Sequence, residues 1–434
     1  MPQPSLLERS LKSVWHPCTQ MKQHESFPLI AIKRGEGVWL WDDNDKRHLD
    51  AVSSWWVNLF GHNNPRIKEA IKQQLDTLEH VMLAGFTHEP VVELSEKLAK
   101  LTGLGHAFYA SDGASATEIA LKMSFHYWRN KGQTTKTKFI SLKNSYHGET
   151  LGALGVTDVA LFKDTYAPLL TQSDQMPSPD FRLAEVGECA EDYACRCADI
   201  LEEYVITHHE HLAAFIIEPL VQCAAGMAMY HPVYLRRACE ICNEYNVHLI
   251  ADEIAVGFGR TGTMFACDYA GVLPDFMCLS KGITGGYLSL SAVLTTDEIY
   301  QAFYDDSTVK GFLHSHSYTG NPLACSAALA TLSIFETDDI LEQNKQKSAY
   351  MLNKMQVLTN LPILNLRQHG MILAFEAITS ADDFSKVCYA EGLKQNLLLR
   401  PIGNTVYFMP PYTITEDEID FMVSATEKTL KATL

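Results

Sequence analysis

The stretch YNVHLIADEIAVGFGRTGTMFACDYAGVLPDFMCLSKGITGG, residues 245–286, decides the fold of this chain. It contains two short apolar runs that each end in charge: VHLIA leads into Asp252 and Glu253, and DFMCLS leads into Lys281. Such runs are typical of buried parallel strands, which carry apolar side chains on both faces. Ligands of open α/β sheets bind beyond the carboxyl ends of the strands. We therefore expect Asp252 and Lys281 to project into one site.

An aspartate and a lysine at such strand ends suit pyridoxal 5′-phosphate (PLP). The lysine amine forms a Schiff base with the cofactor, and the aspartate pairs with the protonated pyridine nitrogen, which keeps the ring an electron sink. The alternative is a structural ion pair at the edge of the sheet. The neighbouring glycines favour the cofactor, because GFGRTG permits a bend and GITGG lets backbone approach a ligand closely.

The composition indicates what class of protein this is and which partners are excluded. The 434 residues are 47% hydrophobic and 20% charged, which is ordinary for a globular enzyme with one large core and a smaller domain. A formal charge of −17 argues against nucleic acid or an anionic membrane as a partner. We find no apolar run that could span a bilayer and no signal-peptide pattern at the start. The odd total of 11 scattered cysteines indicates reduced thiols, and we expect a cytoplasmic location.

Two cysteine pairs were considered as metal or redox sites. Cys239 and Cys242 form a CxxC pattern, and Cys195 and Cys197 form a CxC pattern. Neither has a second pair at zinc-finger spacing, and CEIC lies in a helical pattern where both thiols can face the core. The run HHEH, residues 208–211, is typical of a solvated helix end. We expect no metal site.

A candidate anion site lies where a strand leads into a long helix, in HAFYASDGASATEIALKMSFHYW (residues 106–128). The backbone N–H groups around Gly113 would be free to bind the phosphate of the cofactor. The alternative is an ordinary helix capped by Ser111 or Asp112.

Two aromatic positions could border the same site. Tyr146 follows the strand KFISLKNSYHGET, where its ring can stack on a pyridine ring or simply pack in a loop. Trp55 and Trp56 lie in SSWW, which we expect to be extended. Neighbouring side chains of an extended segment point in opposite directions, so one tryptophan can line a pocket while the other fills a core.

Strand and helix patterns alternate through the middle of the chain, which predicts an α/β fold with a largely parallel sheet covered by helices. From about residue 335 the pattern changes to that of a small α+β domain. We predict three parts: residues 1–60, an arm and strands that join the small domain; residues 61–334, the large PLP-binding domain; and residues 335–434, the C-terminal small domain.

Taken together and in this order, IIEP, LIADEIAVGFGRTG and LSKGITGG resemble the class III aminotransferases, which are PLP-dependent transferases of fold-type I. The resemblance covers nearly the whole chain and implies a mostly parallel seven-stranded sheet in the large domain. WHPCT, SSWW, HVMLAGFTH, SYHGET, HSYTGNP and RPIGNTVYFMPPY resemble one group of this family more narrowly. That group serves biotin biosynthesis: it transfers an amino group from S-adenosylmethionine to 8-amino-7-oxononanoate by a ping-pong mechanism, as a homodimer with shared active sites.

The resemblance also implies roles for single residues. Lys281 would hold the cofactor and move protons, Asp252 would pair with the pyridine nitrogen, and Tyr146 would stack on the ring. The phosphate would be bound at Asp112, Gly113 and Ala114 and, from the neighbouring subunit, by His316 and Ser317. The implied substrate pocket comprises Cys18, Trp55, Tyr146, Lys281, Ser315, Arg400 and Tyr407. Arg400 would receive a substrate carboxylate, for which its planar guanidinium is suited.

Some positions depart from the pattern of this group. Cys18 stands where well-known members have a tyrosine, and Glu149 stands where they have an aspartate. Asp112 brings a carboxylate close to the phosphate, which is tolerable if it turns away to cap the helix.

Rival functions are another ω-aminotransferase (with a lysine, ornithine, 4-aminobutyrate or polyamine donor), a PLP racemase or aminomutase, and a non-catalytic protein of this fold. SSWW disfavours the first, and the intact Asp252 and Lys281 disfavour the last.

Overall fold

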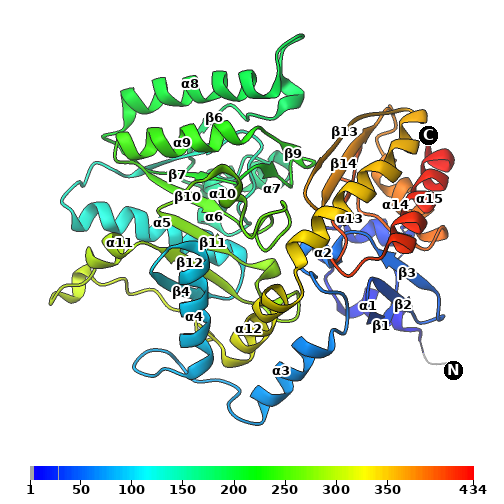
Figure 1. Cartoon of the computed structure of the whole chain (residues 1–434), viewed down its shortest axis with the longest axis horizontal. Coiled ribbons are helices and arrows are strands. Elements are labelled where there is room, and N and C mark those ends of the chain that lie inside the picture. The colour runs from blue at the N-terminus through cyan, green and yellow to red at the C-terminus, as the bar shows by residue number, and fades with distance from the viewer. Residues whose placement is uncertain (1–3, 28) are drawn as a thin grey trace.

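A computed structural model describes residues 4–27 and 29–434. The larger part of the molecule is built on a seven-stranded sheet of order β4-β12-β11-β10-β7-β5-β6 (Figure 1). Its strands are β4 (His106–Ala110), β5 (Lys138–Leu142), β6 (Asp174–Met176), β7 (Leu212–Ile217), β10 (His248–Asp252), β11 (Phe276–Leu279) and β12 (Ser291–Thr295). Only β12 runs antiparallel to its neighbours. The predicted α/β class and the mostly parallel sheet are confirmed.

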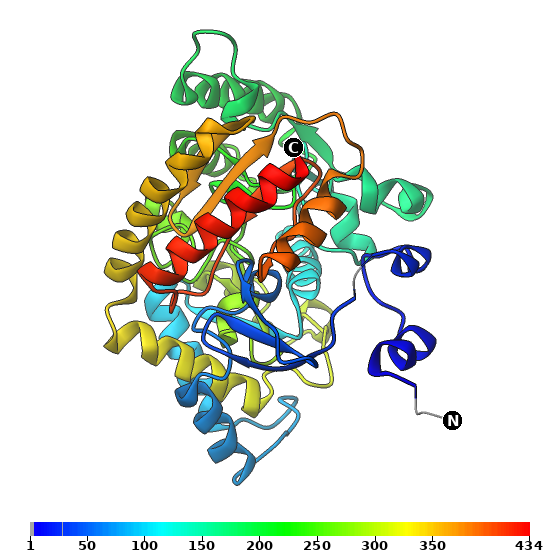
Figure 2. The same ribbon diagram turned by 90° about the vertical axis from the view of Figure 1, so that its right-hand side faces the viewer.

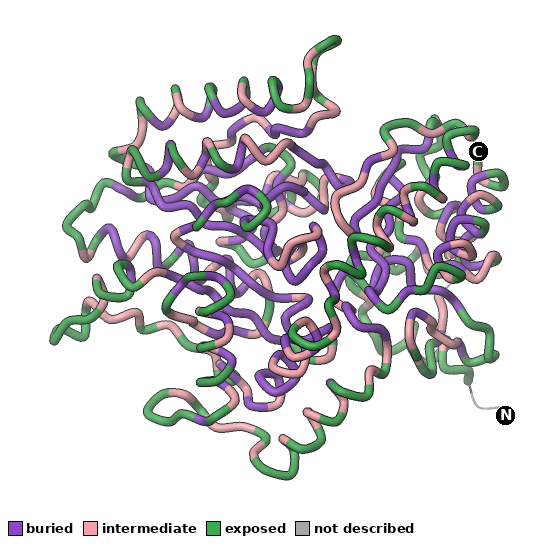
Figure 3. The backbone as a smooth tube through the Cα atoms, in the orientation of Figure 1, coloured by how far each residue is buried: buried purple, intermediate pink, exposed green. Residues whose placement is uncertain are grey.

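The two decisive strands are buried on both faces (Figure 3). Ile250 and Phe276 pack in one apolar cluster with α5 (Gly113–Asn130). Leu249 and Met277 point to the other face and pack with residues of α8 (Ala190–His208) and α9 (Pro232–Glu244). Helices on both faces explain why the runs are apolar throughout rather than alternating.

The smaller part of the molecule lies at the right of Figure 1 and combines both ends of the chain. Strand β15 (Leu397–Leu398) pairs in parallel with β3 (Arg47–Asp50), which continues the hairpin of β1 (Ile32–Glu36) and β2 (Trp39–Asp42). A second sheet has the order β13-β14-β16. The shared sheet agrees with an N-terminal segment that joins the small domain, although the exact domain boundaries stay a prediction.

The remaining elements connect or cover these sheets. The other strands are β8 (Val221–Gln222), β9 (Ala228–Met229), β13 (Ile363–His369), β14 (Ile372–Ala377) and β16 (Thr405–Phe408). The other helices are α1 (Leu6–Ser13), α2 (Ser53–Trp56), α3 (Pro65–Leu75), α4 (Glu89–Thr102), α6 (Leu151–Val156), α7 (Ala160–Lys163), α10 (Ala266–Ala270), α11 (Asp297–Gln301), α12 (Pro322–Thr337), α13 (Ile340–Met355), α14 (Phe384–Lys394) and α15 (Glu416–Thr433). The 3₁₀ helices are η1 (Met21–Glu25), η2 (Asp164–Leu169), η3 (Phe181–Leu183), η4 (Lys281–Thr284), η5 (Thr308–Lys310) and η6 (Gln356–Asn360). Figure 2 shows α1 standing away from the rest of the chain, and none of its residues is buried.

The extended conformation predicted for SSWW is wrong. Residues Ser53–Trp56 form a left-handed turn in which φ is 49°, 46°, 72° and 73° in order. Each such residue costs about 1–2 kcal/mol when it carries a side chain, so tertiary contacts must hold the turn. The two tryptophans still differ in environment: Trp55 is 41% exposed and Trp56 only 5%.

The cysteine pairs lie on helices, as predicted. Cys197 and Cys242 are buried in α8 and α9, and Cys195 and Cys239 are partly buried. The run HHEH begins at the last residue of α8. In the part of the chain that the structure describes, no cluster of three or more His, Cys, Asp or Glu side chains could hold a metal ion. No helix within residues 4–27 and 29–434 is both long and apolar enough to cross a bilayer.

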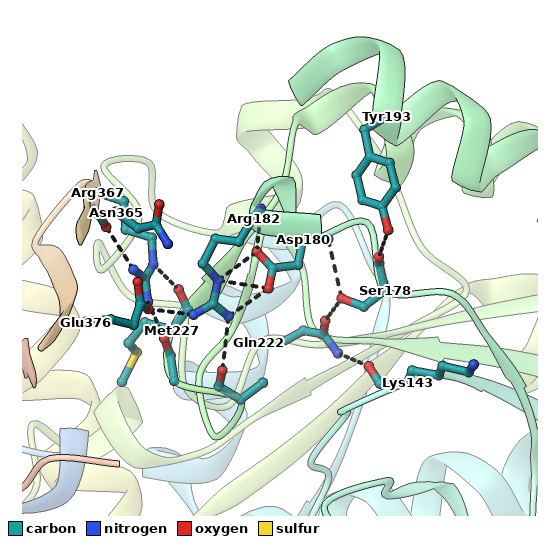
Figure 4. A network of polar contacts seen from close by, with 12 residues as sticks. Lys143, Ser178, Asp180, Arg182, Tyr193, Gln222, Met227, Asn365, Arg367 and Glu376 are labelled. Carbon is teal, nitrogen blue, oxygen red and sulfur yellow. Dashed lines mark hydrogen bonds and ion pairs between the residues drawn. The ribbon is translucent and has the colours of Figure 1, made fainter. Parts of the chain in front are cut away.

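A buried network of ion pairs ties the small part to the large one (Figure 4). Glu376 of β14 accepts a hydrogen bond of 2.6 Å from Arg182 Nη1, and the same oxygen lies 2.7 Å from Arg367 Nη2. Arg182, in η3, also donates to Asp180 over 2.7 Å. One carboxylate therefore compensates two guanidinium groups that come from different parts of the chain.

The substitution Glu376→Gln should lower the free energy of unfolding by about 3 kcal/mol, because it leaves buried guanidinium charge uncompensated. Urea denaturation followed by circular dichroism measures the change. The matched control is Glu336→Gln, which removes the exposed pair with Lys97 (2.8 Å) and should cost at most about 1 kcal/mol. Equal losses for the two variants would contradict the assigned role of the network.

Candidate functional site

A cavity of about 550 Å³ lies where the carboxyl ends of β10 and β11 face the first turn of α5. Its wall contains all six residues that the sequence assigns to the cofactor within one chain: Asp112, Gly113, Ala114, Tyr146, Asp252 and Lys281. Strand ends and a helix start converge here because the sheet is parallel at this point. The structure thus brings the predicted cluster together.

Asp252 is the last residue of β10 and is buried. One oxygen of its carboxylate accepts a hydrogen bond from the backbone N–H of Ile254 (3.1 Å). The other lies 2.7 Å from Nδ1 of His147, whose imidazole is also buried. With a proton on Nδ1, His147 donates a hydrogen bond to this carboxylate. The carboxylate is therefore fixed in orientation at the cavity wall.

Lys281 begins η4, two residues after β11 ends, and adopts a left-handed φ of 41°. Its amine lies 5.2 Å from the centroid of the Trp56 ring. Burial lowers the pKa of Lys281 below the ordinary lysine value, although the nearby Asp252 opposes the shift. A depressed pKa makes the neutral, nucleophilic amine more available near neutral pH.

The start of α5 has the form of an anion site. Asp112 caps the helix: its carboxylate accepts from the backbone N–H of Ser115 (3.0 Å) and from the hydroxyl of Ser111 (2.8 Å). The N–H groups of Gly113 and Ala114 lie in the first turn, where no intrahelical acceptor exists. The alternative of an ordinary cap and the prediction of an anion site are thus compatible, because the cap uses the carboxylate and leaves these two N–H groups free.

Close backbone packing shapes this end of the cavity. A Cβ atom on Gly113 would lie 3.0 Å from Ile254, just beyond β10. Gly148 has a left-handed φ of 124°, and a Cβ atom there would lie 2.5 Å from the Cβ of Ala114. Both glycines let the loop after β5 and the start of α5 approach each other and the strand ends.

Tyr146 lies in that loop and borders the cavity. Its backbone N–H donates to Glu218 (3.0 Å), and its hydroxyl donates to Glu149 (2.9 Å). Burial, assisted by Glu149, raises the pKa of the Tyr146 phenol.

Glu218 follows β7 and also accepts from the N–H of Cys223 (3.2 Å). Burial, with the nearby Asp252, raises the pKa of Glu218 well above its ordinary value.

A second, larger cavity of about 1190 Å³ shares Trp56, Tyr146, Glu149 and Lys281 with the first. Six of the residues implied for the substrate pocket line it: Cys18, Trp55, Tyr146, Lys281, Arg400 and Tyr407. The guanidinium carbon of Arg400 lies 4.2 Å from the centroid of the Trp55 ring. The hydroxyl of Tyr407 accepts from the indole N–H of Trp56 (3.1 Å). Partial burial raises the pKa of the Cys18 thiol, and Glu149 adds to the shift.

The three remaining predicted residues lie elsewhere. Ser315, His316 and Ser317 belong to the loop before α12 and line neither cavity of their own chain. Ser315 and Ser317 are exposed, and His316 lies 3.0 Å from His314 between their Nε2 atoms. This placement leaves their expected contribution from a second subunit as a prediction.

Comparison with known proteins gives the family. The model of the family described as "Aminotransferase class-III" matches residues 20–430. The chain belongs to the class III aminotransferases. An adenosylmethionine-8-amino-7-oxononanoate aminotransferase from Helicobacter pylori is 48% identical, over 96% of this chain and 95% of that protein. A protein of the same name from Aquifex aeolicus is 40% identical, over 99% and 98%.

Solved structures agree with this family. A crystal structure of the aminotransferase of the same name from Methanocaldococcus jannaschii has a TM-score of 0.92 at 37% identity, and 99% of each chain is covered. An ω-transaminase from Pseudomonas jessenii, in complex with PMP, has a TM-score of 0.94 at 29% identity, with 99% of this chain and 98% of that one covered. Enzymes of class III depend on PLP. Here, a buried amine of lowered pKa, an oriented carboxylate, a free helix start and an aromatic ring in one cavity fit that cofactor.

Four further residues of this class III site were not assigned from the sequence: Trp56, His147, Glu149 and Glu218. Glu218 ends a buried apolar run, as Asp252 does, so the same signal could have found it. His147 follows Tyr146 directly, but nothing in the local pattern reveals that it contacts a residue more than a hundred positions away. Trp56 could not be distinguished from a core residue until the turn that orients it was known.

The lowered pKa of Lys281 predicts how the apo-protein takes up PLP. Only the neutral amine attacks the aldehyde, so the condensation rate should rise with pH and reach half its maximum well below about 10.4, the ordinary lysine value. Stopped-flow absorbance measures the rate, and Lys281→Ala is the control that should lose the signal. A midpoint at the ordinary lysine value would contradict the effect of burial.

Proposed function

We propose that this chain transfers an amino group from S-adenosylmethionine to 8-amino-7-oxononanoate, giving 7,8-diaminononanoate for biotin biosynthesis. The observation that carries the proposal is a set of full-length relatives of that name, among them one 48% identical over 96% of the chain. The residues that line the two cavities support it, because they supply both cofactor chemistry and a large substrate space.

Bound PLP supplies an aldehyde that condenses with amines and a ring that withdraws electrons from the bond being broken. Lys281 would hold the cofactor through its amine and, when free, would move the proton from the donor carbon to the cofactor, acting first as base and then as acid. This relay needs an amine that is neutral near pH 7, which burial promotes. Asp252 would pair with the pyridine nitrogen, and the contact with His147 would hold the carboxylate in place.

The other end of the first cavity binds the phosphate. The N–H groups of Gly113 and Ala114 face it at the positive end of the α5 dipole. The carboxylate of Asp112 caps the helix, where it accepts hydrogen bonds from the Ser111 hydroxyl and the Ser115 N–H. Tyr146 stacks on the ring and borders the substrate.

The second cavity recognises the substrates. At about 1190 Å³ it exceeds the roughly 300–1,000 Å³ of pockets for drug-sized ligands, which leaves room for an adenosyl group. Arg400 receives a substrate carboxylate while Trp55 supports its guanidinium plane. The runner-up is an ω-aminotransferase with a smaller donor such as lysine, for which this space is larger than needed.

The active form is proposed to be a cytoplasmic homodimer in which His316 and Ser317 reach the phosphate of the partner site and Ser315 its substrate. Apolar side chains close to this loop support the idea, since Leu313 is 80% and Tyr318 68% exposed. A second copy of the chain would cover them.

A donor and acceptor assay tests the function. Purified enzyme with PLP and 8-amino-7-oxononanoate should form 7,8-diaminononanoate with S-adenosylmethionine and none above background with lysine, as measured by mass spectrometry. Lys281→Ala should reduce turnover by at least about 10⁴-fold, because it removes the group that both binds and relays the proton. Product from lysine alone would favour the runner-up, and no product with either donor would refute the proposal.

The substitution Arg400→Met should raise KM for the carboxylate-bearing substrate by about 10–100-fold, because a charge-assisted pair is lost. Steady-state kinetics over a range of substrate concentration measures it. Lys386→Met is the matched control: this exposed cation lines the outer wall of the same cavity and should change KM by less than about threefold. Equal effects would indicate that general positive charge, not Arg400, recognises the substrate.

Subunit mixing tests the shared site. Lys281→Ala and the double variant His316→Ala/Ser317→Ala should each be nearly inactive alone. After co-refolding or co-expression, random hybrids should recover about a quarter of wild-type activity, because one site in each mixed dimer receives both intact parts. If these loop residues served their own chain, no hybrid would contain an intact site and activity would not return.

A further inference from the structure

The left-handed turn (Ser53–Trp56) presents its two tryptophans to the two cavities, yet it contains no glycine. Trp56 lies 5.2 Å below the amine of Lys281, and Trp55 lies 4.2 Å from the guanidinium of Arg400. Four consecutive residues with positive φ do not persist without contacts that over-determine them. The groups that hold the turn therefore control both aromatic walls.

Asp50, the last residue of β3, is the centre of these contacts. Its side chain is fully buried, and Oδ2 accepts from the hydroxyl of Ser54 (2.7 Å) and lies 3.0 Å from Nε2 of His62. Its Oδ1 accepts from the N–H of Val52 (3.3 Å). The carboxylate thus bonds to Val52, just before the turn, and to Ser54, the second residue of the turn.

His62 connects this carboxylate to the segment that leaves the turn. Its Nδ1 lies 3.1 Å from the side-chain nitrogen of Asn58. The neutral tautomer with its proton on Nε2 satisfies both contacts, since it donates to Asp50 and accepts from Asn58. The backbone of His62 also exchanges two hydrogen bonds with Gly37, at 2.7 and 3.1 Å, in the β1–β2 hairpin. The imidazole is therefore itself held rigidly.

The residue that carries this carboxylate lies on β3, next to the strand β15 that precedes Arg400. Asp50 is paired with Leu398 in β15, two residues before Arg400. The first residue of the turn is held by another contact as well, because the hydroxyl of Ser53 donates to the carbonyl of Met409 (2.6 Å). Asp50 thus bonds to the turn and also belongs to the sheet that contains β15.

We propose that Asp50 and His62 form a positioning pair that holds the left-handed turn and thereby sets the substrate-facing walls made by Trp55 and Trp56. The pair touches neither cavity, so it acts through the tryptophans. This inference rests on the proposed function only for its kinetic consequence. Its structural consequence is independent of any substrate.

The test compares Asp50→Asn with a matched control, Asp42→Asn. Asp42 and His48 form a second buried aspartate–histidine contact (3.3 Å) in the same sheet, away from the turn. Apo-proteins labelled with 5-fluorotryptophan report each of the six tryptophans by ¹⁹F NMR, assigned by Trp→Phe variants. In Asp50→Asn the resonances of Trp55 and Trp56 should move or broaden, and in Asp42→Asn both should stay in place.

The kinetic arm separates positioning from general stability. In Asp50→Asn, KM for the carboxylate-bearing substrate should rise about tenfold or more, while PLP affinity from absorbance titration stays within about threefold, since only the turn is displaced. Asp42→Asn should alter neither. Ser54→Ala, which removes one of the donors to the Asp50 carboxylate and keeps the contact with His62, should move the same two resonances by a smaller amount.

Wild-type resonances for Trp55 and Trp56 in both Asp50→Asn and Ser54→Ala would overturn the proposal, as would equal changes in Asp42→Asn. If Asp50→Asn does not fold, the Trp55 and Trp56 resonances of Ser54→Ala alone test the proposal. A wild-type protein without the proposed aminotransferase activity would refute the function while the ¹⁹F comparison still judges the positioning pair.

Discussion

The structure depends on a buried amine and a buried carboxylate placed at the carboxyl ends of adjacent parallel strands. Asp252 is paired with Cys278 across β10 and β11, so Lys281, three residues later, emerges at the same edge of the sheet. Burying both groups is costly, and the fold limits the cost by lowering the pKa of Lys281 and by giving Asp252 two donors. The lowered pKa of Lys281 favours the neutral amine that PLP chemistry requires.

The two cavities are lined by different parts of the chain. The first is built from strand ends and the start of α5, which the close approach of Gly113 and Gly148 locks together. The second is lined by the N-terminal arm with Cys18, by the short helix α7 with Phe162, and by Arg400 of the C-terminal part. Loops on a rigid scaffold can change substrate preference without disturbing the chemistry beside them. Lys281 and Tyr146 line both cavities and join the two functions.

Much of this arrangement could be predicted from the sequence, because local pattern carries it. Apolar runs ending in charge located Asp252 and Lys281, and a strand followed by small residues located the helix start at Gly113, the candidate anion site. The left-handed turn could not be predicted. Asp50 is close to it in sequence, but Met409 and Tyr407, which also hold it, are brought there by tertiary folding. His147 was missed for the same reason. Ser315, His316 and Ser317 lie outside both cavities of one chain, so the role predicted for them would require a second subunit and stays a prediction.

The central claim is that the amine of Lys281 is the group that holds PLP. The most direct measurement is reduction of the PLP-loaded protein with borohydride, followed by proteolysis and mass spectrometry of the peptides. The account predicts one phosphopyridoxyl group per chain, on the peptide that contains Lys281 and on no other. Stoichiometric label on a different lysine, or a protein that takes no label while it remains folded, would contradict it.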